Sequence, residues 1–126
     1  MGDSMDCCLQ IYTKLPEDLL DSLTALLDDT LVIEEESTNL WYFSEVNWGI
    51  LPDEVIDWLV GHQVPFAWTW GSGANYGQGV TLYSGEDEPS SWGRDGTFLM
   101  LNLEQAADPQ QLAQALALQE WWNNAG

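Results

Sequence analysis

Basic residues are almost absent from this sequence: Lys14 and Arg94 are the only two among 126 residues, and His62 is the only histidine. Nucleic acids and anionic membranes are bound through clusters of Lys and Arg, so neither is expected as a direct partner. A hydrolytic triad needs its histidine together with a nucleophile motif such as GxSxG, and the sequence does not contain that motif.

Cysteines and long apolar segments are also scarce. Cys7 and Cys8 are adjacent, which supports neither a disulfide framework nor a zinc site. The glycine-rich segment 71–79 is not followed by the Lys-Ser/Thr pair of a phosphate-binding loop, and no calcium-loop motif occurs. The sequence shows no signal peptide and no apolar run of membrane length. We therefore expect a cytoplasmic protein without metal, cofactor or membrane contact, and one that is not an enzyme.

Acidic residues dominate what is present. Twenty-one Asp and Glu against two Lys and Arg give a formal net charge of −19. Residues 1–60 carry fourteen acids and one base, which is −13, and residues 61–126 carry seven acids and one base, which is −6; together these give −19. Self-repulsion at this density destabilises a compact fold, which favours a use for the surface that bears it. A basic protein is the partner that this charge indicates.

The rest of the composition predicts a folded chain. Apolar residues make up 45% of the sequence, and eight Trp supply bulky core material, so the body of the chain is not disordered. A length of 126 residues predicts one domain, spanning residues 1–126 with a flexible tail at residues 1–6.

An internal repeat organises the predicted fold. The segment 51–59 (LPDEVIDWL) is a near copy of the segment 15–23 (LPEDLLDSL), and each copy predicts a helix that begins at its proline. The predicted order is β-α-β-β-α-β-β-β-α, an α+β fold with helices packed on a mainly antiparallel sheet. Its first six elements have the order of a ferredoxin-like fold. Strands are predicted at 8–12, 30–36, 40–44, 64–70, 80–83 and 97–103, and helices from Pro16, Pro52 and Pro109.

Two segments of the C-terminal half carry specific expectations. The segment 84–96 is rich in turn-forming and acidic residues, which predicts a mobile loop. The segment 97–103 (TFLMLNL) is almost continuously apolar, which predicts a strand in the centre of the sheet. Trp92 lies in the predicted loop beside Arg94 and is the expected exposed aromatic anchor for a partner.

The acids cluster on the two repeated helices, one strand end and one loop. If the helices lie side by side on one face of the sheet, their outer surfaces form a broad array of carboxylates. Duplex DNA carries one negative charge per ~1.7 Å of its axis, so a rigid acidic surface approximates its potential and competes for a basic groove. The carboxylates expected to replace phosphates are Glu17, Asp18, Asp21, Glu34, Glu35, Glu36, Asp53, Glu54 and Asp57, with Glu86, Asp87 and Glu88 as a second group.

In size, acidity and lack of catalytic motifs the chain resembles the acidic DNA-mimic inhibitors of phages and plasmids, the antirestriction and anti-CRISPR proteins. The resemblance covers composition and size. It implies an inhibitor that blocks the nucleic-acid-binding site of a host defence nuclease or CRISPR effector in the cytoplasm of the host cell.

Other functions remain compatible with the sequence. The chain has the charge of an immunity protein that neutralises a basic nuclease toxin, or of an adaptor domain whose acidity serves only solubility. Acids at a helix start also stabilise the helix dipole, which explains Glu17, Asp18 and Asp21 without a partner. Calcium at residues 86–88 is a weaker explanation than a solvated loop. A ligand- or sugar-binding pocket would draw on Trp41, Trp48, Trp68 and Trp70.

Overall fold

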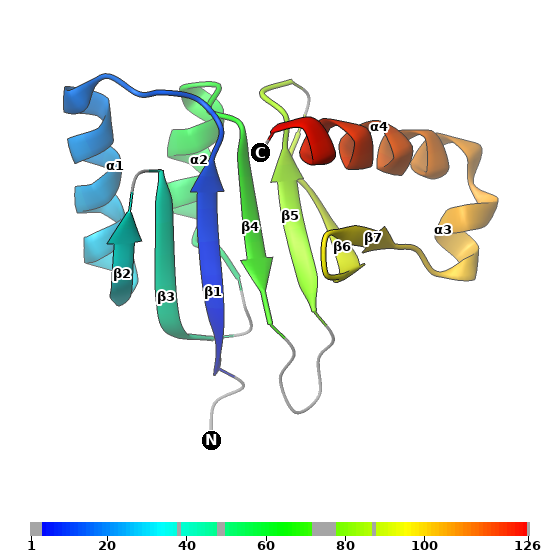
Figure 1. Ribbon diagram of the computed structural model, residues 1–126, viewed down its shortest axis with the longest axis horizontal. Coiled ribbons are helices and arrows are strands. Elements are labelled where there is room, and N and C mark those ends of the chain that lie inside the picture. The colour runs from blue at the N-terminus through cyan, green and yellow to red at the C-terminus, as the bar shows by residue number, and fades with distance from the viewer. Residues whose placement is uncertain (1–3, 38, 48–49, 72–77, 87, 126) are drawn as a thin grey trace.

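The computed structural model describes residues 4–37, 39–47, 50–71, 78–86 and 88–125. Its strands are β1 (Ser4–Ile11), β2 (Ile33–Ser37), β3 (Leu40–Asn47), β4 (Phe66–Trp70), β5 (Gly79–Tyr83), β6 (Ser90–Asp95) and β7 (Phe98–Met100). Its helices are α1 (Glu17–Thr30), α2 (Asp53–Gly61), α3 (Leu103–Ala107) and α4 (Pro109–Ala125). The strands form one antiparallel sheet in the order β2-β3-β1-β4-β5-β6-β7 (Figure 1). The predicted α+β class is confirmed.

The first half of the chain has a ferredoxin-like arrangement. Its four strands lie in the order β4-β1-β3-β2, and every neighbouring pair is antiparallel. α1 connects β1 to β2 and α2 connects β3 to β4, so each helix crosses over one intervening strand. This topology brings α1 and α2 into contact with each other over the same buried core. The two copies of the sequence repeat are therefore neighbours in space.

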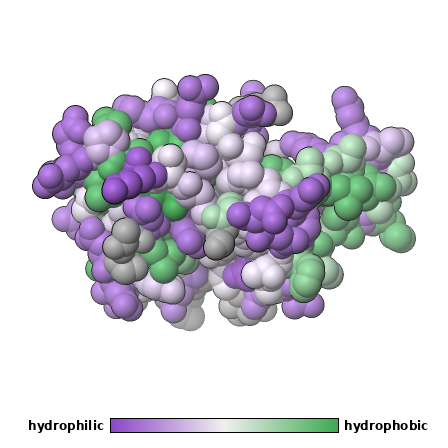
Figure 2. Space-filling view, turned by 45° about the horizontal axis from the view of Figure 1, so that its top comes forward, coloured by the Kyte–Doolittle hydropathy of each residue, from purple (hydrophilic) through white to green (hydrophobic). Residues whose placement is uncertain are grey.

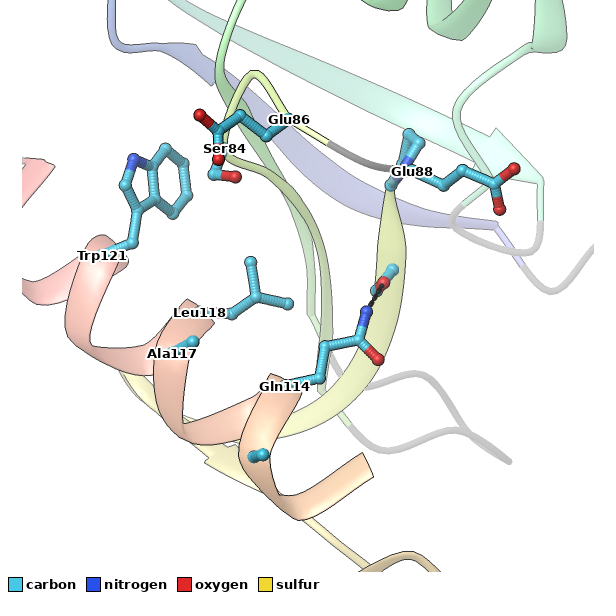
Figure 3. Close-up of a pocket in the computed structure, with 10 residues that line it drawn as sticks. Ser84, Glu86, Glu88, Gln114, Ala117, Leu118 and Trp121 are labelled. Carbon is cyan, nitrogen blue, oxygen red and sulfur yellow. Dashed lines mark hydrogen bonds between the residues drawn. The ribbon is translucent and has the colours of Figure 1, made fainter. Parts of the chain in front are cut away.

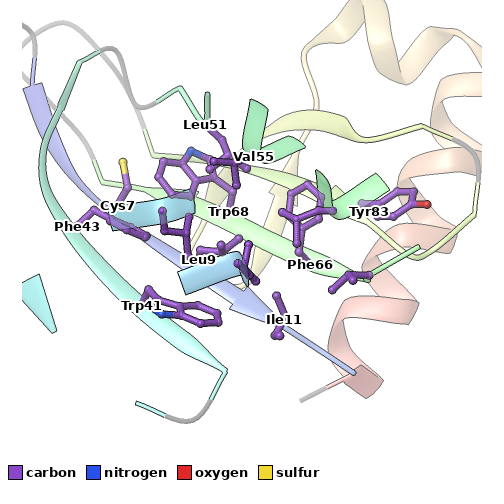
Figure 4. Close-up of a cluster of buried hydrophobic side chains, with 14 of the residues drawn as sticks. Cys7, Leu9, Ile11, Trp41, Phe43, Leu51, Val55, Phe66, Trp68 and Tyr83 are labelled. Carbon is purple, nitrogen blue, oxygen red and sulfur yellow. The ribbon is translucent and has the colours of Figure 1, made fainter. Parts of the chain in front are cut away.

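The main core lies between this half of the sheet and the two helices (Figure 4). Alternate residues of β1 point into it, and the fully buried indoles of Trp41 and Trp68 contribute from β3 and β4. Each helix buries one apolar stripe, made of Leu23 and Leu27 in α1 and of Val55 and Leu59 in α2. Full burial of such a side chain contributes about 1.5–3 kcal/mol. These stripes hold the helices on the sheet and leave their outer surfaces to charged residues.

A second, smaller core lies on the opposite face, under α4. Ala67 faces it, since Ala67 alternates along β4 with the main-core residues Phe66 and Trp68. The buried members of this second core are Ala67, Val80, Leu82, Trp92 and Ala115. The strands at this end of the sheet are thus covered by the C-terminal helix, while β1 to β3 are covered by α1 and α2.

The C-terminal half departs from two predictions. The segment 84–96 contains β6, which pairs with β5, so it is not a loop throughout. The segment 97–103 does not form a central strand: it holds the short edge strand β7, where Phe98 is 66% exposed, and then enters α3. The amide of Gln119 accepts a hydrogen bond from Leu99 N (2.7 Å) and donates one to the Thr97 carbonyl (2.8 Å). An α4 side chain thus occupies edge positions that a further strand would need.

The ends of the chain also differ from the predictions. β1 begins at Ser4, so residues 4–6 lie in a strand and not in a flexible tail, and residues 1–3 lie outside the described residues. α4 begins at Pro109 as predicted, with Asp108 Oδ1 accepting from Gln110 N at 2.9 Å. Along this helix Ala115 is buried, whereas Leu116 is 63% exposed.

Arg94 joins the ends of neighbouring strands. Its Nε donates to the carbonyl of Gly79 at 2.8 Å, its Nη2 to the carbonyl of Trp70 at 3.0 Å, and its Nη1 to the carbonyl of Gly96 at 3.0 Å. Burial lowers the pKa of Arg94 from its ordinary value. The single arginine of the chain is therefore engaged with backbone oxygens at the base of the β4–β5 connection, and it serves the fold.

Burial of Cys7 predicts a loss of stability in alkali. Burial, with a smaller contribution from the charge of Asp6, raises the pKa of this thiol from 9.0 to about 12. Above pH 9.0 the Cys7 thiol loses its proton in the unfolded chain but keeps it in the folded protein, which favours unfolding. The stability that the protonated thiol contributes is therefore complete below pH 9.0 and is lost as the pH rises towards 12. We expect Cys7→Val to remove about 1 kcal/mol of the fall in unfolding free energy between about pH 7 and pH 10. Urea titrations measure it, and an equally steep fall in the variant would contradict it.

Candidate functional site

The outer surfaces of α1 and α2 form an acidic surface, which we call the helical carboxylate face. Both helices bury one stripe against the sheet, so their remaining positions point to solvent, and the helices touch each other. All carboxylates of the face are exposed: Glu17, Asp18, Asp21, Asp28 and Asp29 on α1, and Asp53, Glu54 and Asp57 on α2. The structure therefore brings together six of the carboxylates predicted from the sequence and adds Asp28 and Asp29.

Much of the exposed apolar surface lies away from the helical carboxylate face. Figure 2 shows that hydrophobic surface gathers at the end of the molecule where α3 lies, away from the end where α1 lies. Leu103 is 91% exposed at that end, and residues 98–118 include only two acids, Glu104 and Asp108. The acidic character of the chain is thus concentrated on the half that carries α1, α2 and β2.

The three glutamates of β2 lie on an edge strand of the sheet. A bulge follows Ile33, after which Glu35 pairs with Tyr42 and Glu36 pairs with Trp41. Glu36 therefore projects on the side of the main core and Glu35 on the opposite side, and Glu34, Glu35 and Glu36 are all exposed. Charge at this edge opposes pairing with another strand, which is a structural explanation for these residues.

The helix dipole separates the acids that stabilise α1 from those that do not. Glu17 and Asp18 lie in the first turn of α1, where a carboxylate is favourable, and Asp53 and Glu54 do the same in α2. Asp28 and Asp29 lie at the opposite end of α1, where no basic residue accompanies them and the dipole repels a negative charge. Helix stability therefore does not explain their position.

We expect the double variant Asp28→Asn/Asp29→Asn to be more stable than the wild type. Each substitution removes a repulsion of about 0.3–1 kcal/mol between a carboxylate and the C-terminal end of the helix. Urea titrations at low ionic strength give the difference, and added salt diminishes it by screening. The matched variant Glu17→Gln/Asp18→Asn removes the same charge at the other end and should be less stable than the wild type. Equal effects of the two variants would show that net charge alone matters.

The second predicted group of carboxylates lies apart from the helical carboxylate face. Glu86 and Glu88 are exposed on the connection between β5 and β6, and Asp87 lies outside the described residues. Both glutamates line a groove of about 1080 Å³ against α4 (Figure 3). Glu88 also lines a hollow of about 510 Å³ together with Asp57 of α2, so this hollow connects the two acidic regions.

Trp92 is placed differently from its prediction, whereas Trp41 and Trp68 are core residues. Trp92 is only 6% exposed and belongs to the second core, so it is not an exposed anchor. The prediction was wrong because the neighbouring turn-forming residues indicated a loop, whereas they form β6. Trp41 and Trp68 are fully buried in the main core, and Trp48 lies outside the described residues. Trp70 is half-buried and lines the 510 Å³ hollow. Trp121, which the sequence did not single out, lines the 1080 Å³ groove.

His62 has a structural environment. Its ring stacks on Trp58 with centroids 4.1 Å apart, and its Nδ1 lies 2.8 Å from the Trp58 carbonyl at the end of α2. Within the described part of the chain, no three His, Cys, Asp or Glu side chains are grouped so as to hold a metal ion. What the described residues offer is acidic surface, together with cavities bordered by Trp70 or Trp121.

Comparisons with known proteins identify no relative of this chain. No family model matches the chain, and neither a curated protein nor a solved structure was found that matches it. Among the described residues, no helix is long and apolar enough to cross a membrane.

Proposed function

We propose that this protein is an inhibitor that mimics nucleic acid and occupies the basic nucleic-acid-binding site of a host defence nuclease or CRISPR effector. The observation that carries the proposal is the helical carboxylate face, with eight exposed carboxylates on two helices in contact. The protein contributes no catalytic group of its own; it acts by occupying its partner's site.

The spacing of the carboxylates supports the comparison with DNA. At 1.5 Å per residue, α1 with its 14 residues is about 21 Å long and carries five of them, which is one charge per about 4 Å. α2 with its 9 residues is about 14 Å long and carries three, which is one per about 4.5 Å. One strand of duplex DNA carries one charge per 3.4 Å of axis, roughly the same linear density. Two adjacent helices therefore present two rows of negative charge.

The position of Asp28 and Asp29 supports a role outside the fold. Selection for helix stability alone would not place two acids at the negative end of α1. A basic partner reverses the balance, because Lys and Arg opposite these carboxylates turn a repulsion within the helix into an attraction across the interface. Acidic steering also speeds association with a basic groove and makes it sensitive to salt.

The test is affinity capture with the tagged protein from lysate of its host cells. Bound proteins are washed with rising salt, and a second sample is washed with duplex DNA or with RNA. We expect a protein that binds nucleic acid, is released by salt and is displaced by the nucleic acid. A nuclease toxin with these properties would identify an immunity protein that uses the same face. A partner retained through both high salt and excess nucleic acid would overturn the proposal.

A further inference from the structure

The groove between α4 and the β5–β6 connection has a built aromatic wall (Figure 3). Trp121, Leu118 and Ala117 line it from α4, and Glu86 and Glu88 line it from the connection. A hydrogen bond of 2.8 Å from Gln114 Nε2 to Ser90 Oγ joins the two walls. The groove thus combines apolar, aromatic and acidic surface in one cavity of about 1080 Å³.

Trp121 is held in place from behind. Tyr12 contacts its ring edge to face, with centroids 5.4 Å apart and planes at 82°. The hydroxyl of Tyr12 in turn accepts a hydrogen bond from Trp122 Nε1 at 3.1 Å. Because these contacts fix Trp121 while the side chain is still half-buried at the groove, little freedom is lost when a ligand stacks on it.

The chemistry of the groove selects a cation. An indole face attracts a guanidinium or ammonium group, and Trp is the strongest of the aromatic side chains in this respect. Glu86 lies at the same end of the groove as Trp121, whereas the carboxylate of Glu88 points away from the indole (Figure 3). Leu118 points into the groove and offers apolar surface for the aliphatic part of a long basic side chain. Planar stacking on Trp with a carboxylate beside it favours arginine over lysine.

We infer that this groove binds an arginine side chain of a basic protein, with the guanidinium stacked on Trp121 and paired with Glu86. The inference rests on the proposed function for the class of partner, and it supplies the aromatic anchor that Trp92 does not provide. Glu88 and Pro89 line both this groove and the hollow that Asp57 of α2 borders, so the two cavities share the β5–β6 connection.

The test uses two labelled octapeptides of alternating residues, Gly-Arg and Gly-Lys, titrated into the full chain and followed by fluorescence anisotropy. We expect the arginine peptide to bind more tightly, and Trp121→Leu to weaken it about 3- to 30-fold, the range of a cation–π contact. Trp58→Leu is the matched control, since Trp58 is another half-buried Trp on a helix. Equal losses in the two variants, or no preference for arginine, would overturn the inference.

A second pair of variants changes only exposed side chains, so its result does not depend on packing in the core. Glu86 and Glu104 are both exposed, so Glu86→Gln and Glu104→Gln each remove one charge without disturbing the fold. We expect Glu86→Gln to weaken the arginine peptide and Glu104→Gln to leave it nearly unchanged; equal effects would show attraction by net charge only. If the groove variants bind the peptide like the wild type but the protein still captures a partner that DNA displaces, this inference fails and the proposed function stands. If no such partner is captured but the peptide result holds, the proposed function fails.

Discussion

Replacing Asp21, Asp28, Asp53 and Asp57 together by lysine is expected to weaken binding of a DNA-displaceable partner by at least about 100-fold. Each replacement removes one attraction and adds one repulsion opposite a basic groove, and four changes of about 0.7 kcal/mol or more give that factor. The net charge changes by eight, from −19 to −11. All four residues are exposed, so the fold should survive, which circular dichroism checks. Competition with duplex DNA for the captured partner gives the affinity.

The control variant carries the same net charge. It replaces four exposed acids that lie neither on the helical carboxylate face nor on the β5–β6 connection: Asp6, Asp95, Glu104 and Glu120. Their replacement by lysine also gives −11, from −19 plus eight. We expect this variant to keep most of its affinity and to lose mainly association rate, because long-range steering depends on total charge. Equal losses in the two variants would mean that the face has no special role.

The sequence predicted the first half of the fold well because local patterns and burial agree there. The proline, the first-turn acids and the leucine stripe of 15–23 all indicate a helix on a sheet, and 51–59 repeats them. The repeat fits two βα halves, but it does not by itself fix where the two helices lie. The array of carboxylates was expected on the condition that the helices lie side by side, and α1 and α2 are in contact. Asp28 and Asp29 were missed because their significance depends on where α1 ends.

The second half was predicted less well because burial there depends on partners distant in the sequence. The run TFLMLNL is apolar enough for a central strand, yet it lies at the sheet edge and Gln119 of α4 binds its backbone. Trp92 is surrounded by Ser, Gly and Asp, and only its pairing opposite Val80 and the cover by α4 bury it. Trp121 and Trp122 are adjacent in sequence, so which of them lines a groove is fixed by the rotation of α4 against Tyr12.

Among the glycines that the structure describes, Gly79 is the one where an added methyl group meets the closest atoms. A Cβ at Gly79 would overlap the indole ring of Trp70, which lies across this position of β5. The carbonyls of both residues accept hydrogen bonds from Arg94, so a displacement of either strand end disturbs the same cluster. We expect Gly79→Ala to lower the free energy of unfolding by about 1–3 kcal/mol, the range for overpacking a well-packed contact. That is a large part of the roughly 5–15 kcal/mol typical of a domain.

Two further variants separate overlap from other effects of the substitution. At Gly71 an added Cβ would meet only the Asp6 carbonyl, at 3.9 Å, so Gly71→Ala should be nearly neutral in the same urea titrations. Trp70→Ala removes the ring that the methyl group added at position 79 would meet, so the double variant Gly79→Ala/Trp70→Ala should be more stable than the sum of the two single losses predicts. Simple additivity would mean that the loss in Gly79→Ala does not arise from overlap with the indole. A coupling in this direction would show that the indole of Trp70 is held against Gly79, where it lines the 510 Å³ hollow.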